Sequence, residues 1–502
     1  MVKSARRRRL RQFSVCLEEL TLKKLAPTLW ACAIAGILAA CSGGGATSSS
    51  GGGHSGLMPA TGTGTPIQHV VLIIQENRTF NNFFATFPGA TGTTTGMENV
   101  NGVTEPITLT ETALADKKNL RHSYPGFLRA YDNGKMDGFN LVDSPGTGRP
   151  EKSAPYEYVN PADIGPYWTM AETYGLGNAM FATQGSESFP AHQDLIRGGT
   201  AISSSESLID NLPYANDAWG CDSPPGSKTA VITTTLQLKA RAGPYPCTKN
   251  FPNGGTSYTT LRDLFDGASP AISWKYYTPK IGGSGGIWSA FDVIYPVRDG
   301  PEWKANVISP ETTILTDISS GNLAQMSWVV PDGENSDHPG NTSDTGPSWV
   351  ASVVNAIGES QYWNTTAIIV VWDDWGGFYD PVVPTCTSGS QCRDNQGGPG
   401  FRVPLLVVSP YSTVGLGSNG GYVSNKIYSF GSIIRFVEDT FNLGRLGTTD
   451  ATTNSLGPEY GSQGGDLFDF TQSPRQFQSI GSKYSRSYFL HRMPSRIPPD
   501  TE

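Results

Sequence analysis

Two adjacent carboxylates end an apolar stretch of the chain. The sequence TTAIIVVWDDWGGFYD (365–380) places Asp373 and Asp374 directly after β-branched residues, with Gly376 and Gly377 close behind. Neighbouring side chains of a regular strand point to opposite faces, so both carboxylates can face one ion only if the strand ends there, and the glycines permit that break. Without a cation, two like charges at a buried strand end repel, and one tends to hold a proton. In the alternative interpretation, one aspartate caps a turn and the other faces solvent.

A second pair of potential ligands follows another apolar run, HVVLIIQEN (69–77). Glu76 and Asn77 offer a carboxylate and an amide oxygen in consecutive positions, and oxygen donors suit hard or borderline divalent cations. Arg78 comes next and offers the alternative of a structural ion pair with Glu76. The residues alone leave both interpretations open.

Ser188 is the candidate nucleophile. In GSESFPAHQD (185–194) it occupies the position of a helix N-cap, and Pro190 is allowed in the first turn. The N–H groups at a helix start favour a phosphate oxyanion, and a serine hydroxyl becomes a good nucleophile when a metal ion or a base activates it. A plain N-cap role for Ser188 is the alternative, and Ser186 is the second-choice nucleophile.

Three of the six histidines are candidates for a catalytic role. His122 opens HSYPGFLRAYDNGKMDGFN, and His338 follows Glu-Asn-Ser-Asp and precedes a proline. Neighbouring acids and turn residues favour these two. His192 lies one turn into the helix predicted after Ser188. A single histidine is more often structural, so each assignment has a structural alternative.

The elements that must position these residues are strands and helices of an α/β protein. Near-continuous Val, Ile and Leu are typical of strands covered on both faces. Such runs lie at 69–77, 273–279, 326–332, 365–374 and 403–411. Apolar residues at helical spacing within 350–360 precede the fourth run, which is half of a βαβ crossover.

Potential ligands follow three of these runs. They are Glu76 with Asn77, the segment 332–338 that contains His338, and Asp373 with Asp374. In open α/β sheets, sites form beyond the carboxyl ends of the strands. Three independent runs with such endings therefore predict one site at that edge.

The N-terminus predicts export. A basic cluster precedes a short apolar run at 25–40, and Leu-Ala-Ala-Cys41 resembles a bacterial lipobox. We expect a lipoprotein-type signal peptide at 1–40, a Gly/Ser-rich tether at 41–65 and a membrane anchor through a lipid on Cys41. The protein would then be a cell-envelope lipoprotein or secreted. The alternatives are an ordinary signal cut elsewhere and an uncleaved anchor.

The rest of the chain, 66–502, is predicted to be a single domain. The formal net charge is −8, and removal of residues 1–40, which carry eight Lys or Arg and two Asp or Glu, makes it −14. This charge does not indicate nucleic-acid binding, and any anion site must be local.

Four cysteines remain after Cys41, in two local groups. Cys221 lies near Cys247 and Cys386 near Cys392. An exported chain favours disulfides, and the local pairing is the simplest of three connectivities. Free buried thiols are the alternative.

Six motifs together resemble one protein family. They are VVLIIQENRTFNNFF, LRHSYPGFLRAYDNGKMDGFN, QGSESFPAHQDLIRGG, SWVVPDGENSDHPG, WNTTAIIVVWDDWGGFYD and GFRVPLLVVSPY. In this order, from about residue 68 to 440, the set resembles the bacterial phosphoesterase family that includes respiratory-burst-inhibiting acid phosphatases and non-haemolytic-type phospholipases C.

The resemblance implies a fold and residue roles. The implied fold is an alkaline-phosphatase/sulfatase-like α/β sandwich with a central, mainly parallel sheet flanked by helices. The implied ligands of one divalent metal ion, of unknown identity, are Glu76, Asn77, Ser188, Asp373 and Asp374. Ser188 would also be the nucleophile, and His122 and His338 would hold phosphate or protonate the leaving group. His192 matches a less regular position.

The chain departs from the family pattern at Ser186, Glu187, Ala191, Pro381 and the segment 429–432. These differences concern substrate contacts more than the metal ligands. About 60 residues follow the region of resemblance, which ends near residue 440, and this favours the compact acid-phosphatase form over phospholipases with extra C-terminal domains.

The predicted function is metal-dependent hydrolysis of phosphate esters, as an acid-phosphatase-like phosphomonoesterase with a phosphoseryl intermediate. The first alternative is a phospholipase C that cleaves phospholipid phosphodiesters. An alternative of another class is a non-catalytic surface lipoprotein on a phosphatase scaffold, which the residues Pro381 and Phe430 make conceivable.

Overall fold

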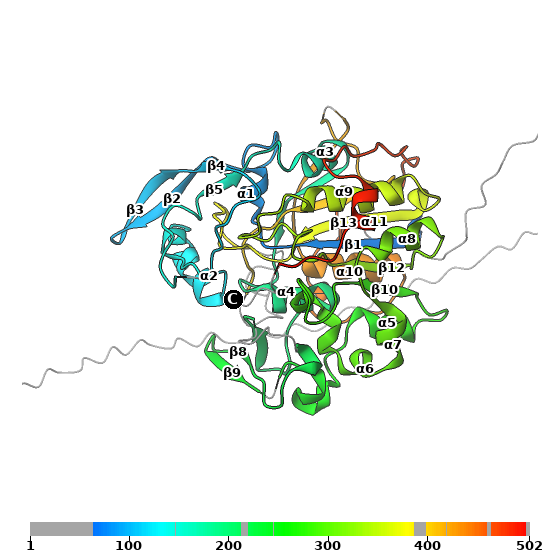
Figure 1. Cartoon of the computed structure of the whole chain (residues 1–502), viewed down its shortest axis with the longest axis horizontal. Helices are drawn as coiled ribbons and strands as arrows, with labels where there is room; N and C mark the ends of the chain where they lie inside the picture. Colours follow the sequence, from blue (N-terminus) through cyan, green and yellow to red (C-terminus); the bar gives the residue numbers. More distant parts are fainter. Residues whose placement is uncertain are drawn as a thin grey trace, which may run out of the picture. The chain divides into compact units, whose positions relative to one another are not determined.

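An eight-stranded sheet is the framework of the computed structural model, with strand order β11-β10-β12-β1-β13-β14-β6-β15. Figure 1 labels β1, β10, β12 and β13 of this sheet. The strands are β1 (His69–Gln75), β6 (Gly175–Phe181), β10 (Trp274–Tyr277), β11 (Val307–Ile308), β12 (Met326–Val329), β13 (Thr366–Trp372), β14 (Leu405–Val408) and β15 (Tyr422–Ser429). Strand β14 is antiparallel to β13 and β6, and the other neighbouring strands are parallel. The prediction of a mainly parallel α/β sheet is confirmed.

The structure describes residues 64–145, 147–211, 219–243, 245–385, 398–417, 419–458 and 463–497, which belong to one unit by their contacts. The predicted signal peptide 1–40, Cys41 and all but the last two residues of the tether 41–65 lie outside the described residues. So do Cys386 and Cys392. These assignments, and the extent 66–502 of the domain, stay predictions.

The central strands are buried on both faces, as their composition indicated. Every residue of β13 is buried, and β1 is buried from Val70 onward. The two strands pair in parallel from His69 with Thr366 to Gln75 with Trp372. Each of the five apolar runs contains a strand, and the polar residues at 76–77 and 373–374 lie just beyond strand ends.

Helices cover the sheet. They are α1 (Phe80–Phe84), α2 (Tyr124–Tyr131), α3 (Gly165–Thr173), α4 (Ser188–Arg197), α5 (Leu261–Gly267), α6 (Tyr295–Arg298), α7 (Pro301–Asn306), α8 (Thr313–Ser319), α9 (Gly346–Gly358), α10 (Phe430–Thr440) and α11 (Arg486–His491). Helix α9 packs with α3, α8 and α11, while α4 packs with α5 and α10 (Figure 1). Among the described residues, no helix has the length and apolar character needed to cross a membrane.

The predicted crossover is present. Helix α9 connects β12 to β13, which lie on either side of β1 and run parallel to it. The carboxyl ends of these three strands therefore meet at one edge of the sheet.

Smaller sheets complete the described part of the chain. They are formed by β2 (Thr95–Val100) with β3 (Val103–Thr108), by β4 (Thr110–Thr112) with β5 (Glu157–Val159), and by β7 (Glu206–Ile209), β8 (Thr229–Thr233) and β9 (Leu238–Ala242). The predicted disulfide between Cys221 and Cys247 is present. It joins the segments on either side of the β8–β9 pair, so it closes the ends of that hairpin.

A buried ion pair fixes the chain beyond β13. Arg402 donates from Nε to Asp380 Oδ1 at 2.9 Å and from a terminal nitrogen to Oδ2 at 3.0 Å. The other terminal nitrogen donates to the carbonyl oxygen of Asn178 in β6 at 2.9 Å. A bidentate pair of this kind is geometrically specific, so it ties the turn after β13 to the segments around it.

Candidate active site

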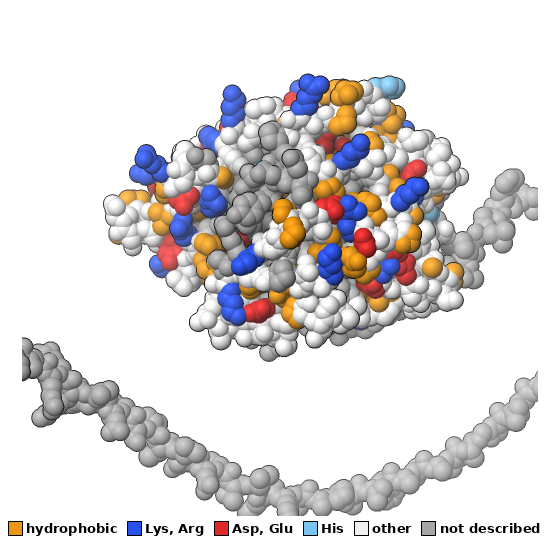
Figure 2. Space-filling model, turned by 60° about the horizontal axis from the view of Figure 1, so that its bottom comes forward, with side chains coloured by type: hydrophobic (Ala, Val, Ile, Leu, Met, Phe, Trp, Pro, Cys, Tyr) orange, Lys and Arg blue, Asp and Glu red, His pale blue; other side chains and the backbone are white. Residues whose placement is uncertain are grey.

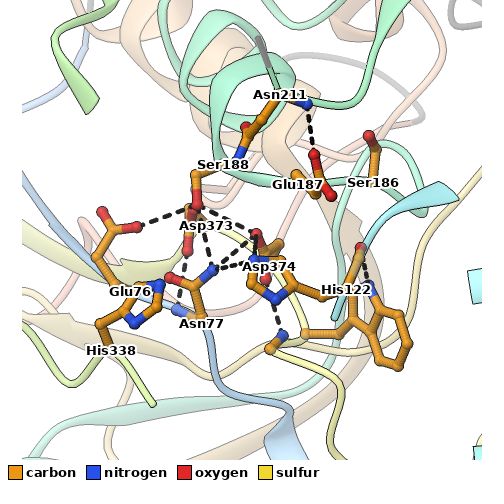
Figure 3. A network of polar contacts seen from close by, with 12 residues as sticks. Glu76, Asn77, His122, Ser186, Glu187, Ser188, Asn211, His338, Asp373 and Asp374 are labelled. Atoms are coloured by element: carbon orange, nitrogen blue, oxygen red, sulfur yellow. Dashed lines mark hydrogen bonds and ion pairs between the residues drawn. The ribbon is translucent and has the colours of Figure 1, made fainter. Parts of the chain in front are cut away.

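Asp373 and Asp374 are each anchored through one carboxylate oxygen (Figure 3). Asp373 Oδ1 accepts the backbone N–H of Asn77 at 3.0 Å, and Asp374 Oδ1 accepts that of Gly376 at 2.8 Å. Both side chains are fully buried. The alternative in which one of them faces solvent is therefore wrong, and their Oδ2 atoms are directed at neighbouring site residues.

Gly376 and Gly377 make the turn that the sequence indicated. Their φ angles are 56° and 81°, in the left-handed region that favours glycine. A Cβ on Gly376 would lie 2.0 Å from the carbonyl oxygen of Asn77, and one on Gly377 would lie 2.3 Å from Leu120 Cβ. Both the backbone conformation and the space exclude a side chain here.

Asn77 connects the two strand ends. Its Nδ2 lies 2.8 Å from His122 Nε2, 3.2 Å from Ser188 Oγ and 3.0 Å from Asp374 Oδ2. Its Oδ1 is buried and has no hydrogen-bond partner. A half-turn of the amide exchanges the two atoms and would direct Oδ1 to a cation shared with Ser188 and Asp374.

Ser188 faces the carboxylates of both neighbouring strands. Its Oγ lies 3.4 Å from Glu76 Oε2 and 3.3 Å from Asp374 Oδ2. Glu76 is fully buried, and Ser188 is 2% exposed. The hydroxyl therefore has two candidate acceptors for its proton, and water has little access to it.

The predicted N-cap role of Ser188 is wrong. Ser188 is the first residue of α4, and Glu187, in an extended conformation, is the N-cap. Asn211 provides the missing cap from another part of the chain, because its Oδ1 accepts the backbone N–H of Phe189 at 2.8 Å. Its own backbone N–H donates to the Glu187 carboxylate. The N–H of Phe189 is thus already bonded within the protein.

Ser186, the second-choice nucleophile, bonds to Asp210 instead of the strand-end carboxylates. Its Oγ accepts the backbone N–H of Asp210 at 2.7 Å and lies 3.0 Å from Asp210 Oδ1. The same Oδ1 accepts the N–H of Tyr124 at 2.6 Å. Burial raises the pKa of Asp210 to about 6. Ser186 therefore helps to hold the loop that presents Ser188.

Sequence reasoning missed Asp210 and Asn211. Both residues follow directly after β7. They therefore show the pattern that indicated the candidate metal ligands, which is a strand followed by polar residues. The pattern was available, but β7 is only four residues long and its apolar run is weak.

His122 and His338 have their protons placed by backbone carbonyls. His122 Nδ1 lies 2.8 Å from the carbonyl oxygen of Leu120, and His338 Nδ1 lies 2.6 Å from that of Pro339. In each neutral ring the proton is therefore on Nδ1, and Nε2 is the basic nitrogen. The ring centroids are 6.2 Å apart, and both rings are buried. The two histidines named from the sequence thus lie together beside Asn77.

His192 belongs to the same cluster, although its family position is less regular. Its Nε2 lies 2.9 Å from Glu76 Oε1 and 3.8 Å from Asp373 Oδ2. Burial lowers the pKa of His192 to about 4, so the imidazole is neutral at physiological pH. Atoms of Glu76, His192 and Asp373 all lie within 4.8 Å of one another, a spacing that a metal ion can bridge. Its position four residues after Ser188, on the same helix face, was the available signal.

Arg78 bonds elsewhere than the alternative interpretation supposed. Its Nε donates to the carbonyl oxygen of Asp337 at 2.8 Å, and its guanidinium lies 4.9 Å from the ring centroid of Phe378. Burial lowers its pKa to about 10. Arg78 therefore holds the loop after β12.

The third strand end joins the other two through Gln75. Its Nε2 donates to the carbonyl oxygen of Asn335 at 3.2 Å, and its Oε1 accepts the backbone N–H of Asp337 at 3.1 Å. These bonds place His338 at the same edge as Glu76. The convergence of three strand ends that the sequence predicted is thus present.

The electrostatics of the cluster favour a cation. Three carboxylates, on Glu76, Asp373 and Asp374, are buried at one edge. The buried oxygens Asn77 Oδ1 and Asp373 Oδ2 have no hydrogen-bond partner. Buried charges and polar atoms are costly unless paired or bound to a metal ion, so these residues fit a divalent cation.

The face of the molecule drawn in Figure 2 carries side chains of both charges. Lys and Arg side chains lie there among Asp and Glu, without a large patch of one sign.

Comparisons with known proteins agree with the proposed resemblance. The family model described as the Phosphoesterase family matches residues 67–444. The chain is 24% identical over 428 residues to the non-hemolytic phospholipase C of Pseudomonas aeruginosa, with 75% of this chain and 54% of that protein covered. It is 24% identical over 412 residues to phospholipase C A of Mycobacterium tuberculosis, with 71% and 70% covered. The chain spans about half the length of the first of these relatives.

Two of the solved structures that the chain resembles have TM-scores below 0.5. One is a protein of the alkaline phosphatase superfamily from Vibrio parahaemolyticus, with 10% identity, a TM-score of 0.32, and 59% of this chain and 66% of that chain covered. The other is a sulfatase from Pseudoalteromonas sp., with 10% identity, a TM-score of 0.36, and coverages of 82% and 74%.

Substitution of Gly376 tests the geometry of the turn. Gly376→Ala places a methyl group against the Asn77 carbonyl, so we expect turnover of a phosphate ester to fall about 10- to 100-fold through displacement of Asp374. Gly102→Ala is the matched control, because Gly102 also has a positive φ, 88°, but a Cβ added there would meet nothing within 4 Å. Equal activity in the two variants would contradict the positional role of Gly376.

Proposed function

The chain belongs to the phosphoesterase family, and on that premise we propose that it hydrolyses phosphate esters with a divalent metal ion and Ser188 as the nucleophile. The observation that carries the proposal is the position of Ser188 Oγ, within 3.4 Å of Glu76 and Asp374 and bonded by Asn77. Groups able to accept its proton surround this hydroxyl, and burial limits its exposure to bulk water.

The proposed metal ligands are Glu76, Asn77, Ser188, Asp373 and Asp374, with one divalent ion. Carboxylate, amide and hydroxyl oxygens suit several divalent ions, so the ligand set does not select one. When bound, the ion would lower the pKa of the serine hydroxyl and balance the negative charge of the transition state.

The residues of the chain then have distinct roles. Ser188 Oγ attacks phosphorus in line with the leaving oxygen and transfers its proton to Asp374 or Glu76. The bond from phosphorus to the leaving oxygen breaks as the Ser188–phosphorus bond forms, which gives a phosphoseryl intermediate. His122 or His338, protonated at Nε2, gives its proton to the leaving alcohol. Water then attacks phosphorus and gives a proton to that histidine while the Ser188–phosphorus bond breaks. The proton held by the carboxylate returns to Ser188 Oγ, which releases phosphate and restores the hydroxyl.

The substrate that we propose first is a phosphate monoester, in line with the resemblance of the chain to the acid phosphatases of this family. The second candidate is a phospholipid phosphodiester, which the names of the curated relatives favour, since both are phospholipases C. We also propose export and a lipid anchor on Cys41, in line with the predicted signal peptide.

The nature of the product separates the two substrates. Incubation with a chromogenic phosphate monoester and, separately, with phosphatidylcholine vesicles should release inorganic phosphate from the first at the higher kcat/KM. Preferential release of phosphocholine from the second would reverse the order of the two candidates.

Replacement of the nucleophile is the direct test of mechanism. We expect Ser188→Ala to lower kcat for a phosphate ester by at least about 1000-fold, because the attacking oxygen is removed. Ser186→Ala keeps that oxygen and should lose far less activity. Retained turnover in Ser188→Ala, or inactivity confined to Ser186→Ala, would assign the nucleophile elsewhere.

Metal binding can be measured without turnover. We expect His192→Ala to weaken the affinity for Mn²⁺ or Zn²⁺ about 10- to 100-fold in calorimetric titrations, since His192 contacts Glu76. His69→Ala is the control, because His69 lies at the opposite end of β1 and contacts the carbonyl of Ala324. A wild-type protein that binds neither ion and is inactive would favour the non-catalytic scaffold.

A further inference from the structure

The C-terminal part of the described chain reaches the loop that carries His338. The family match ends at residue 444, and the segment 475–497, called here the C-terminal strap, lies beyond it. The strap passes along α9, and Figure 1 draws α11 in red beside that helix. Tyr484 donates its backbone N–H to Ser348 Oγ at 3.2 Å, and the rings of Phe489 and Trp349 have centroids 5.4 Å apart.

Arg492 joins the strap to the loop 332–338. One terminal nitrogen lies 3.1 Å from Asp332 Oδ2 and 2.9 Å from Glu334 Oε2, and the other donates to Asn335 Oδ1. The side chains of Arg492 and Asp332 are only 8% and 5% exposed. The guanidinium therefore binds three polar positions of the loop from a largely buried place.

A second contact from the strap acts on the same carboxylate. The backbone N–H of Ser495 donates to Asp332 Oδ2 at 2.9 Å. Asp332 Oδ1 in turn accepts the backbone N–H of Asn335 at 2.9 Å. One carboxylate thus links the strap, through its two oxygens, to the turn of the loop.

The hydrogen bonds continue from this turn to the site. The carbonyl oxygen of Asn335 accepts Gln75 Nε2 at 3.2 Å, and Gln75 directly precedes Glu76. Ser336 Oγ accepts the backbone N–H of His338 at 3.3 Å. A movement of the turn would therefore shift His338 and the hydrogen bonds that join Asn335 and Asp337 to Gln75 of β1.

The charges around Asp332 make the turn depend on Arg492. Glu311 is also buried here, and burial together with the charge of Asp332 raises the pKa of Glu311 to about 8. Burial raises the pKa of Asp332 as well, while the Arg492 charge opposes that rise. Without Arg492, Asp332 would be a buried carboxylate without its cation, and it would take up a proton or turn toward water. Either change removes the support of the loop.

We propose that Arg492 is a positioning residue of the active site, which holds His338 in place through the loop 332–338. The inference rests on the proposed catalytic function of His338. Arg492 lies outside the family match and touches none of the proposed metal ligands, so its effect on turnover passes through the loop.

Two variants on the strap test this role. Arg492→Gln removes the cation, and we expect kcat to fall about 10- to 100-fold with a smaller change in KM, because a misplaced proton donor slows the chemical step. Arg492→Lys keeps the charge and should recover part of the loss. Arg486→Gln is the matched control, since Arg486 lies on the same strap and pairs with the half-exposed Glu359. Its kcat should equal that of the wild type.

Hydrogen exchange provides a readout that does not depend on catalysis. Amides of residues 333–341 should exchange faster in Arg492→Gln than in the wild type or Arg486→Gln, while those of β1 and β13 stay protected. Unchanged exchange and unchanged kcat in Arg492→Gln would overturn the proposal. An equal loss of kcat in Arg486→Gln would also overturn it, because it would indicate a general effect on the strap.

A double mutant separates this inference from the proposed function. If Arg492 acts through His338, the addition of Arg492→Gln to His338→Gln should cause no further loss of kcat. If the losses of kcat in the two single variants multiply in the double variant, Arg492 acts independently of His338 and the positioning role is overturned. Full activity in His338→Gln would contradict the proposed catalytic role of His338. A loss of activity in His338→Gln together with wild-type activity in Arg492→Gln would overturn the positioning role of Arg492 and leave the proposed function standing.

Discussion

The burial of three carboxylates at one sheet edge is the constraint on which the site depends. Glu76, Asp373 and Asp374 are all fully buried, and charges removed from water are stable only when other groups compensate them. Backbone N–H groups compensate one oxygen of each aspartate, and His192 contacts Glu76. The negative charge that these contacts leave uncompensated favours a bound cation at this edge of the sheet.

The order of the strands creates this concentration of charge. Strands β12, β1 and β13 are neighbours and run parallel, so the residues that follow them must leave the sheet at the same edge. The apolar strands in turn hold the carboxylates in place, because every residue of β13 is buried between covering layers. The packing that stabilises the fold thus keeps the three carboxylates close together and out of solvent.

Residues from distant parts of the chain hold the loops around the charges. Asn211 caps α4 behind Ser188, Asp210 holds Ser186, and Arg402 ties Asp380 to β6. Each of these contacts restrains a loop that would otherwise respond to the repulsion at the centre. Arg492 has the corresponding place on the side of His338. The precision of the site thus depends on a surrounding set of polar contacts as well as on the strands.

The sequence by itself determined the strands and the residues that follow them. Long runs of β-branched residues require burial on both faces, and a polar residue after such a run can lie only where the strand ends, so Glu76, Asn77, Asp373 and Asp374 could be named without coordinates. Local signals did not place the start of α4, because the cap of that helix comes from Asn211, 23 residues beyond Ser188. Helical spacing places His192 on the same face as Ser188, but only the tertiary structure decided that it contacts Glu76 and that Arg492 reaches Asp332. Contacts between residues far apart in the chain depend on how the layers pack, and no local pattern of residue types carries that information.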